Sequence, residues 1–389
     1  MTYGASAGRR DGNGVLVTGA TGFVGREVLS RYLERTDRTV YALVRADDAA
    51  AADERLRDGL RTATGTGVGE SERLVAVAGD VQQPDLGLDG AVRDRLAEDV
   101  SDVIHSAASV SFALPLDESR AINVEGTRNI VAFAERCASS GGLHRLCYVS
   151  TAYVAGTHAG EFGEDDFDVG QDFRNAYEES KFEAERLVRS HEDRLPVQIV
   201  RPSIVVGERR SGWTGSFNVL YAPLKVFVRG RLPALPARPR APVDVVPVDY
   251  VADAIFELSS GDGAADNRTW HLVAGRDATT VERLVGLAAE RIDRRAPRLL
   301  RPGPYRRLLH PLLVRTGSER RKRGLRQMEV FFPYLAMRVR YSDGATRRRL
   351  GRVGIAPGNV ESYFERLIGF AQRAGWGRET ISREQARQA

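Results

Sequence analysis

The first half of the chain alternates short aliphatic runs with longer stretches in which apolar residues recur at helical spacing. Residues 15–17 form one such run, and from Phe23 to Leu33 the apolar positions repeat with a period near 3.6. Aliphatic runs that predict four further strands lie at 39–44, 74–80, 102–109 and 144–150. Strands that alternate with helices favour an α/β fold, a doubly wound parallel sheet with flanking helices.

A glycine-rich turn joins the first predicted strand to the first predicted helix. Gly19, Gly22 and Gly25 in TGATGFVG form a GxxGxxG pattern, a variant of the GxGxxG fingerprint. Glycines at this spacing allow a tight turn, close approach of the backbone to a pyrophosphate and close packing of helix on strand. The helix N-terminus then faces the phosphates. A turn without a ligand is the alternative, but its place between strand and helix favours a Rossmann-like dinucleotide cradle.

The residue after the second predicted strand indicates which dinucleotide is bound. Arg45 stands where folds specific for NAD carry an Asp or Glu that bonds the ribose 2′-hydroxyl. An acid would repel a 2′-phosphate, whereas a guanidinium attracts it and can bond it through two nitrogens. We therefore predict NADP, used as NADPH; a solvated arginine in an arginine-rich chain is the alternative.

The next two strand ends are expected to complete the nucleotide site. The third strand ends at Asp80, and the fourth runs into a loop of small residues that ends at Ser109. These positions should border the adenine and the ribose next to the nicotinamide. His105, inside the fourth strand, is interpreted as a packed core residue rather than a catalytic base.

A tyrosine and a lysine lie four residues apart in the sequence NAYEESKFEAERL. On a helix Tyr177 and Lys181 share a face, so the ammonium can sit beside the phenol and favour its ionised form. A tyrosine in this setting can act as an acid or a base near neutral pH. A surface pair on an amphipathic helix is the alternative, but the chain has only three lysines. We therefore predict an enzyme.

Length and composition are typical of a soluble globular protein. The 389 residues suffice for one large or two modest domains, and 42% are hydrophobic and 28% charged. No run of 18 apolar residues predicts a spanning helix, and residues 1–13 lack the apolar core of a signal peptide. Cys137, Cys147 and the six histidines form no metal motif. We expect a cytoplasmic protein with no metal and a disordered tail at 1–13, and the oligomeric state is open.

Positive charge gathers in the last third of the chain. Between 294 and 352 lie 18 Lys and Arg residues against three acids, a local charge of +15, so the rest carries −10 out of a total of +5. A solvated face is one interpretation; the other is an anionic partner such as coenzyme A, an acidic carrier protein or a membrane surface. Nucleic acid is not expected, because the stretch has no recognisable reading motif and its aromatic residues (Phe331, Phe332 and Tyr334) are grouped with Leu335 and Met337 as in an apolar core or a lipid-facing segment.

The pattern of the remaining chain suggests a division into parts. We expect an NADP-binding domain at 14–205, substrate-binding segments at 206–300 and a basic, mostly helical region at 301–389. The segment 231–242 is too rich in proline for a helix or a central strand and is predicted to be a loop. The apolar stretch 217–228 suits the wall of an acyl pocket, and it suits a buried helix equally well.

Taken together, these motifs resemble the extended short-chain dehydrogenase/reductases. TGATGFVG, the loop SAAS, INVEGT, YVSTAYVAG and the YEESK helix match that family in order and spacing. Within it the chain is most similar to fatty acyl-CoA reductases and to thioester reductase domains, through VIHSAASVSFALPL, RPSIVVGERRSGWTG and PVDVVPVDYVADAI. The resemblance covers about residues 14–260.

This resemblance implies a role for each matching residue. Tyr177 would be the general acid, Lys181 would bind the ribose hydroxyls, and Thr151, with Ser150 as the fallback, would bond the reacting carbonyl, where negative charge develops. Asn123 would support the lysine through a water. The cofactor-binding residues would be Thr18, Gly19, Thr21, Gly22, Phe23, Val24, Gly25, Arg45, Asp80, Val81, Ala107, Ala108, Ser109, Tyr177, Lys181, Pro202, Ser203 and Ile204.

The implied reaction is reduction of an activated acyl group, carried on coenzyme A or on a carrier protein, to an aldehyde; a second reduction to the alcohol is open. Two other functions stay open. One is another extended-family enzyme, either a sugar-nucleotide epimerase or dehydratase or a hydroxysteroid-type dehydrogenase. The other is a non-catalytic NADP-binding regulatory protein, against which the intact Tyr177 and Lys181 argue.

Overall fold

A parallel sheet forms the centre of the molecule. The computed structural model describes residues 13–388 except 65–66, 141, 218, 230–233, 262–267, 306, 308–310, 312–314 and 316–328. Within this part, seven parallel strands follow the order β3-β2-β1-β4-β5-β7-β12. They are β1 (Gly14–Thr18), β2 (Thr39–Val44), β3 (Leu74–Ala78), β4 (Val100–His105), β5 (Arg145–Val149), β7 (Val197–Pro202) and β12 (Arg268–Leu272). The predicted doubly wound α/β fold is confirmed, with Asp80 in the turn after β3.

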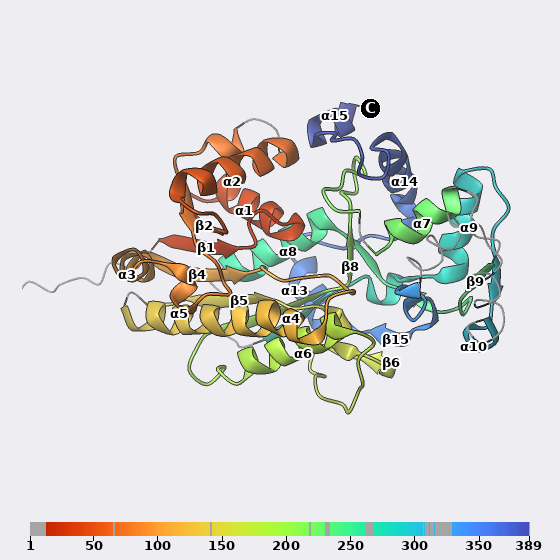
Figure 1. Ribbon diagram of the computed structural model, residues 1–389, viewed down its shortest axis with the longest axis horizontal. Helices are drawn as coiled ribbons and strands as arrows, with labels where there is room; N and C mark the ends of the chain where they lie inside the picture. Colours follow the sequence, from red (N-terminus) through yellow and green to blue (C-terminus); the bar gives the residue numbers. More distant parts are fainter. Residues whose placement is uncertain are drawn as a thin grey trace, which may run out of the picture.

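Helices cover both faces of this sheet (Figure 1). One face packs against α1 (Phe23–Arg35), α2 (Ala49–Thr64) and α8 (Val248–Ser260); the other packs against α3 (Gly90–Asp99), α5 (Gly126–Ser140) and α6 (Ala176–Arg189). The strands are rich in aliphatic residues because both of their faces are buried, as in other parallel sheets. None of the helices that the described residues form is long and apolar enough to cross a membrane.

The edge strand β12 comes from beyond residue 205, the limit expected for the nucleotide-binding domain. Between β7 and β12 the chain leaves the sheet, forms part of a second layer and returns through α8, which packs along α1. The two expected parts are therefore interwoven along the chain. We call the seven-stranded sheet with its flanking helices the nucleotide half, and the remaining elements the substrate half, after the roles expected from the sequence. The substrate half lies beside the carboxyl ends of the sheet strands (Figure 1).

The substrate half is built from short paired strands and helices around its own apolar core. Its strand pairs are β8 (Ile204–Val206) with β11 (Val245–Pro247), β9 (Ala234–Pro236) with β14 (Arg298–Leu300), β10 (Pro242–Val243) with β13 (Thr279–Thr280), and β6 (Ala159–Phe162) with β15 (Arg338–Tyr341). Its helices are α7 (Tyr221–Val228), α9 (Val281–Arg291), α10 (Pro302–Pro304), α13 (Gly344–Gly351), α14 (Phe364–Arg373) and α15 (Arg383–Gln388), while α4 (Leu116–Arg120) precedes α5.

The proline-rich segment differs from the expected loop. Its described residues include β9, which pairs with β14 in a two-stranded parallel ladder and places Pro236 opposite Leu300. Proline is tolerated there because a strand with a single neighbour has one side free of ladder hydrogen bonds. The prediction of a loop is thus wrong for 234–236, and 231–233 lie outside the described residues.

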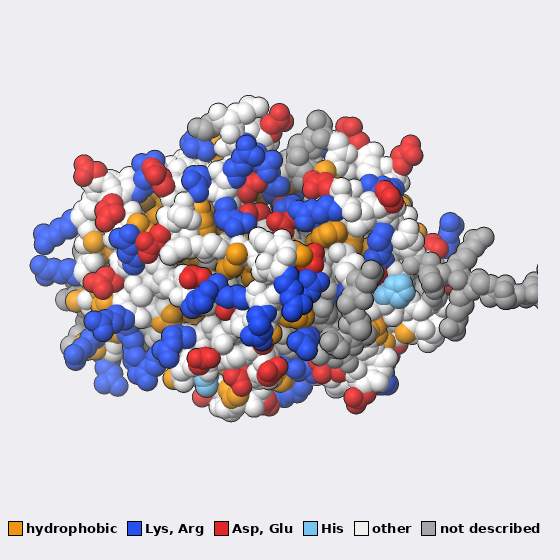
Figure 2. Space-filling view, turned by 180° about the vertical axis from the view of Figure 1, so that it is seen from behind, with side chains coloured by type: hydrophobic (Ala, Val, Ile, Leu, Met, Phe, Trp, Pro, Cys, Tyr) orange, Lys and Arg blue, Asp and Glu red, His pale blue; other side chains and the backbone are white. Residues whose placement is uncertain are grey.

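Basic side chains gather over the substrate half. Figure 2, which views the molecule from behind, shows Lys and Arg side chains clustered at the end that Figure 1 labels α9 and α10. Four exposed arginines of this end, Arg294, Arg295, Arg298 and Arg301, surround β14. Part of the charge cluster predicted from the sequence therefore lies on the surface, whereas Arg320, Arg321, Lys322 and Arg323 lie outside the described residues.

Candidate active site

The glycine turn between β1 and α1 has the shape of a phosphate cradle. Gly19 has a φ of +70°, and a Cβ added to it would lie 2.7 Å from the amide nitrogen of Ala107. A Cβ on Gly25 would lie 2.3 Å from the carbonyl oxygen of Gly19, so helix and turn touch backbone to backbone. Gly22 caps α1 without a side-chain bond, which leaves the first amides of the helix free to bind a pyrophosphate. The turn therefore fits a dinucleotide.

A buried histidine at the end of β4 links this strand to the end of its neighbour β1, where the glycine turn begins. The Nδ1 atom of His105 lies 2.7 Å from the Thr18 hydroxyl and its Nε2 lies 3.1 Å from the Thr127 hydroxyl. The Thr18 oxygen also accepts the amide of Ala107 at 3.2 Å, at the start of the loop of small residues. Burial, with the charge of Lys181 as a smaller cause, lowers the His105 pKa to about 3. His105 is therefore a neutral structural residue, as the sequence indicates.

Two arginines meet at the end of β2. The Arg45 side chain is exposed, and the guanidinium of Arg55, on α2, donates a 2.7 Å hydrogen bond to the Arg45 carbonyl. Asp80 bonds within its own turn, where Oδ1 accepts the amide of Gln82 at 3.0 Å. The sequence analysis missed Arg55, because only the packing of α2 beside β2 brings it to this strand end.

Tyr177 lies in the first turn of α6. The helix begins after Asn175, whose side-chain oxygen accepts the amide of Glu178 at 3.0 Å. Burial raises the pKa of Tyr177 to about 12, while a side-chain hydrogen bond with Thr151 acts to lower it. The ionised form expected beside Lys181 is thus not favoured here. The phenol stays protonated at neutral pH, as a proton donor must be.

Lys181 lies one turn further along α6 and is buried. Its Nζ donates a 2.9 Å hydrogen bond to the carbonyl of Val149 and lies 4.3 Å from the centre of the Tyr148 ring. Burial lowers the pKa of Lys181 to about 7, and the negative charge of Glu185 partly opposes that shift. The Lys181 ammonium therefore lies at the end of β5, the same strand end that Thr151 follows.

Asn123 connects the loop after β4 to α6, the helix that carries Lys181. It lies in a turn of π-helix, Ala121–Glu125, between α4 and α5. Its side-chain oxygen accepts the amide of Ser109 at 2.8 Å, and its nitrogen donates to the Ser180 hydroxyl at 3.0 Å. Single turns of this kind occur often at functional sites. Asn123 therefore bridges the loop after β4 and the residue preceding Lys181.

The structure separates the two hydroxyls at the end of β5. Ser150 donates a 2.6 Å hydrogen bond to the buried carboxylate of Glu185, which is also paired with Arg201 at 2.6 Å. The Thr151 hydroxyl accepts the amide of Tyr153 at 3.2 Å, and its interaction with the Tyr177 phenol acts to lower the pKa of that phenol. Pro202, Ser203 and Ile204 follow at the end of the neighbouring strand β7, where the Thr151 hydroxyl lies 3.5 Å from the Pro202 carbonyl. Thr151 is therefore the hydroxyl next to the Tyr177 phenol.

An apolar pocket lies in the substrate half. Its empty space, including the open mouth, is about 780 Å³. It is lined by Tyr153, Ile204, Val219, Leu220, Pro223, Leu224, Phe227, Leu235, Pro242, Val243, Val281, Leu284, Val285, Ala288, Pro297, Phe331, Tyr334, Leu335 and Met337. The segment 217–228 thus contributes to the wall, in its described part, and most of it is also the helix α7.

Aromatic rings connect this pocket to Tyr177. The Tyr334 ring, which lines the pocket, stacks on Phe112 with centroids 5.2 Å apart, and Phe112 lies 5.5 Å from the Tyr177 ring. Phe331 also contacts Phe112, at 6.3 Å. Sequence analysis placed Phe112 and Tyr334 in no site, and no local pattern relates them, because they approach only in the folded chain.

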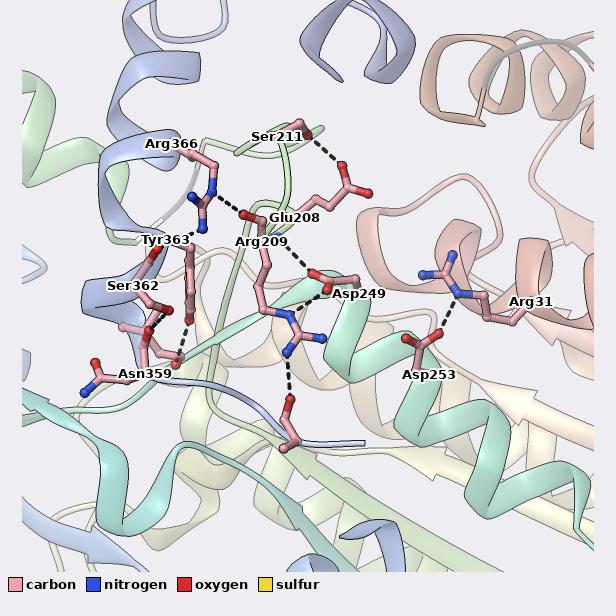
Figure 3. A network of polar contacts seen from close by, with 12 residues as sticks. Arg31, Glu208, Arg209, Ser211, Asp249, Asp253, Asn359, Ser362, Tyr363 and Arg366 are labelled. Atoms are coloured by element: carbon pink, nitrogen blue, oxygen red, sulfur yellow. Dashed lines mark hydrogen bonds and ion pairs between the residues drawn. The ribbon is translucent and has the colours of Figure 1, made fainter. Parts of the chain in front are cut away.

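A polar network fixes the loop that follows β8 (Figure 3). The backbone amide and Nε of Arg209 bond the two carboxylate oxygens of Asp249 on α8, at 3.0 and 2.8 Å. Its Nη1 donates to the Ala356 carbonyl, and Arg366 on α14 donates to the Arg209 carbonyl at 2.6 Å. Through Arg209, the motif RPSIVVGERRSGWTG therefore connects α8 to α14, a helix near the C-terminal end of the chain.

No metal site accompanies these groups in the part of the chain that the structure describes, where no three His, Cys, Asp or Glu side chains are arranged to hold an ion. What the described residues bring together is a phosphate cradle, a protonated phenol whose pKa is influenced by a neighbouring hydroxyl, a buried lysine and an apolar pocket. This set can bind a dinucleotide and protonate an oxygen close to an apolar substrate.

Comparison with known proteins gives a consistent result. Residues 17–255 match the family model of the male sterility protein. The peptide synthetase FrzA of Cladobotryum sp is 32% identical over 88% of the chain, and a putative fatty acyl-CoA reductase of Drosophila melanogaster, CG8306, is 29% identical over 68%. The chain spans only 33% and 59% of these two proteins.

Among solved structures, the terminal R domain of the myxalamid PKS-NRPS biosynthetic pathway is similar over 94% of this chain and 91% of its own, with a TM-score of 0.80 and 29% identity. The agreement extends through the C-terminal segments, beyond the residues of the family model. The chain therefore belongs to the male sterility protein family of extended short-chain dehydrogenase/reductases, together with fatty acyl-CoA reductases and thioester reductase domains.

Proposed function

We propose that the protein is an NADPH-dependent reductase that converts an acyl thioester to an aldehyde. The observation that carries the proposal is the row of aromatic contacts from the apolar pocket to the acid: Tyr334 lines the pocket and stacks on Phe112, and Phe112 lies 5.5 Å from the Tyr177 ring. An apolar pocket of this kind suits an acyl chain better than a sugar nucleotide, which needs many polar partners.

The residues of the chain supply binding and proton transfer. When bound, NADPH supplies the hydride that reduces the thioester carbonyl. The phenol of Tyr177 donates its proton to the carbonyl oxygen as charge develops there, and the Thr151 hydroxyl donates a second hydrogen bond to that oxygen. Lys181 holds the ribose hydroxyls. The carbon–sulfur bond of the thiohemiacetal then breaks, the hydroxyl proton passes to the departing sulfur, and thiol and aldehyde are released.

The proposed preference for NADPH rests on Arg45 and Arg55 together. Arg45 follows β2, and Arg55 of α2 reaches the same strand end, where the ribose of the adenosine half binds in this fold. Two guanidinium groups can bond a 2′-phosphate with charge-assisted hydrogen bonds. In NAD-specific folds the position of Arg45 carries an acid, which would repel that phosphate. The remaining predicted contacts of the cofactor belong to the glycine turn, Asp80, Val81, the loop 107–109 and residues 202–204.

The proposed substrate is a thioester carried on the arm of a carrier protein, because FrzA is a peptide synthetase and the myxalamid domain belongs to a synthetase pathway. A coenzyme A thioester is the second candidate. A further reduction of the aldehyde to the alcohol would use the same acid, Tyr177, and a second NADPH.

Incubation with NADPH and octanoyl thioesters of N-acetylcysteamine and of coenzyme A tests this function. We expect loss of absorbance at the nicotinamide band and formation of octanal, identified by gas chromatography. The same incubation with octanal separates two-electron from four-electron reduction. Turnover of UDP-sugars, or of none of these compounds, would refute the proposal in favour of an epimerase or a regulatory protein.

A further inference from the structure

The segment that closes the pocket comes from beyond the residues of the family model. Tyr334 lies in the short turn Tyr334–Ala336 and is buried between Phe112, at 5.2 Å, and Tyr153, at 5.3 Å. Phe112 in turn lies 5.5 Å from the Tyr177 ring. Only one aromatic ring thus separates Tyr334, in the wall of the pocket, from the proton donor.

The hydroxyl of Tyr334 makes a second connection to the same helix turn. It donates a 2.7 Å hydrogen bond to the Glu178 carboxylate and accepts one, also 2.7 Å long, from the side-chain nitrogen of Asn175. Asn175 is the N-cap of α6, and Glu178 directly follows Tyr177. The backbone that carries the acid is therefore held from both sides by one hydroxyl of a distant segment.

The carboxylate of Glu178 depends on these bonds. Its side chain is fully buried, its oxygens accept the amide and guanidinium of Arg174 at 3.0 and 3.3 Å, and Tyr334 supplies the third donor. An incompletely bonded buried carboxylate is costly, so loss of the Tyr334 hydroxyl should disturb this turn. The position of Tyr177 is thus sensitive to Tyr334, a residue that also lines the pocket.

We propose that Tyr334 is both a positioning residue for Tyr177 and a determinant of acyl-chain specificity in this reductase. The ring forms the part of the pocket wall that stacks on Phe112, the neighbour of Tyr177, and the hydroxyl fixes the first turn of α6 through Glu178 and Asn175. This proposal rests on the proposed function, because it assigns the pocket to the acyl chain of the thioester.

Two substitutions separate the two roles. Tyr334→Phe keeps the ring and removes both hydrogen bonds, whereas Tyr334→Ala removes the ring as well. Tyr363→Phe is the matched control, because Tyr363 is a buried tyrosine of the same half that bonds the Val245 carbonyl at 3.5 Å and does not line the pocket. Each protein is assayed with the butanoyl, octanoyl and dodecanoyl thioesters of N-acetylcysteamine.

For Tyr334→Phe we expect a roughly tenfold lower kcat for every substrate, the equivalent of about 1.4 kcal/mol for lost bonds to a charged group, with the wild-type dependence of KM on chain length. For Tyr334→Ala we expect the same loss of kcat and an altered chain-length profile. In the wild type, KM should fall by about fourfold per methylene while the pocket fills, from about 0.8 kcal/mol per buried CH₂.

The outcomes distinguish the two proposals. A wild type that reduces no thioester overturns the proposed function and this inference with it. A wild type that reduces thioesters, with Tyr334→Phe and Tyr334→Ala matching Tyr363→Phe in kcat and in chain-length profile, overturns the role of Tyr334 alone. A loss of melting temperature in Tyr334→Ala with unchanged kcat and profile would likewise make Tyr334 a purely structural residue.

Discussion

The hydroxyl of Ser150 donates a 2.6 Å hydrogen bond to the carboxylate of Glu185, which lies beneath it on α6. Glu185 is also bound by Arg201 and Arg189, at 2.6 and 2.9 Å, so this buried carboxylate is fully paired and its pKa is lowered in spite of burial. Ser150 therefore belongs to a structural charge cluster, whereas its neighbour Thr151 lies next to the Tyr177 phenol.

This division predicts different effects for two adjacent substitutions. Thr151→Val should lower kcat by about 10²-fold, because a donor to the developing oxyanion is lost, and should reduce the free energy of unfolding by about 1 kcal/mol, because the amide of Tyr153 loses its acceptor. Ser150→Ala should keep kcat within a few-fold but reduce the free energy of unfolding by about 1 to 2 kcal/mol, because Glu185 loses a donor. Steady-state kinetics and urea unfolding of both variants measure this; a larger kcat loss in Ser150→Ala would reverse the assignment.

Removal of the phenol hydroxyl tests the acid. Tyr177→Phe should lose turnover by about 10²-fold or more while NADPH still binds, since the glycine cradle and Lys181 are unchanged. Kinetics and a cofactor titration followed by fluorescence give both quantities. Tyr363→Phe serves as the control, and equal activity in Tyr177→Phe would exclude this residue as the proton donor.

The choice of cofactor is tested at the end of β2. Arg45→Asp should weaken NADPH far more than NADH, by about 1.5 to 3 kcal/mol for one charge-assisted contact, and Arg55→Ala should have a smaller effect in the same direction. Arg61→Asp, on the exposed side of the same helix α2, is the control for a change of net charge. A wild type that prefers NADH would contradict the prediction directly.

The buried lysine predicts a pH dependence of stability. The Lys181 pKa of about 7 in the folded protein is below the ordinary 10.5, so the unfolded chain binds more protons between these two values and stability rises with pH across that window. Lys181→Met removes this burial cost. It should melt higher than the wild type at pH 6, lose that advantage as the pH rises toward 10.5, and be nearly inactive.

Calorimetry at several pH values measures this effect. Lys225, which is half-buried and bonds the Trp376 carbonyl at 3.4 Å, provides the control Lys225→Met with a weaker pH dependence. If Lys181→Met melted lower than the wild type at every pH, the lysine would be stabilising in its charged form, and the burial argument would be wrong.

The basic surface predicts a salt effect that depends on the substrate. Arg294, Arg295, Arg298 and Arg301 flank Pro297, which lines the pocket, so they should attract the phosphates of a thioester carrier and raise kcat/KM at low salt. The effect should fade as the Debye length falls to about 8 Å. Octanal carries no phosphate, so its kcat/KM should not show this dependence on salt.

The comparison uses octanoyl-CoA and octanal at low and moderate salt. Changing the four arginines to Gln should remove the salt effect for octanoyl-CoA, whereas the same change at Arg61, Arg95, Arg128 and Arg136, exposed residues of the nucleotide half, should not. If both substrates respond alike in all proteins, the arginines form a solvated face. The same test extended to Arg320, Arg321, Lys322 and Arg323 covers the stretch outside the described residues.

The sequence by itself determined the features that local physics controls. Aliphatic runs such as 15–17 and 39–44 predict buried parallel strands, because only strands covered on both faces lack polar positions. The glycine spacing predicts the turn, since Gly19 and Gly25 stand where a Cβ would collide with backbone. The i, i+4 spacing places Tyr177 and Lys181 on one helix face, and that follows from helix geometry alone.

Only the tertiary structure decided what each of these residues touches. Whether Ser150 or Thr151 faces the phenol depends on Glu185 and Arg201, which come from other elements. The pKa of Tyr177 moves upward rather than downward because burial by the surrounding chain, together with the negative charge of Glu178, outweighs the interaction with Thr151. Tyr334 reaches the first turn of α6 through contacts between segments far apart in the sequence, and such contacts leave no periodicity that a single sequence can reveal.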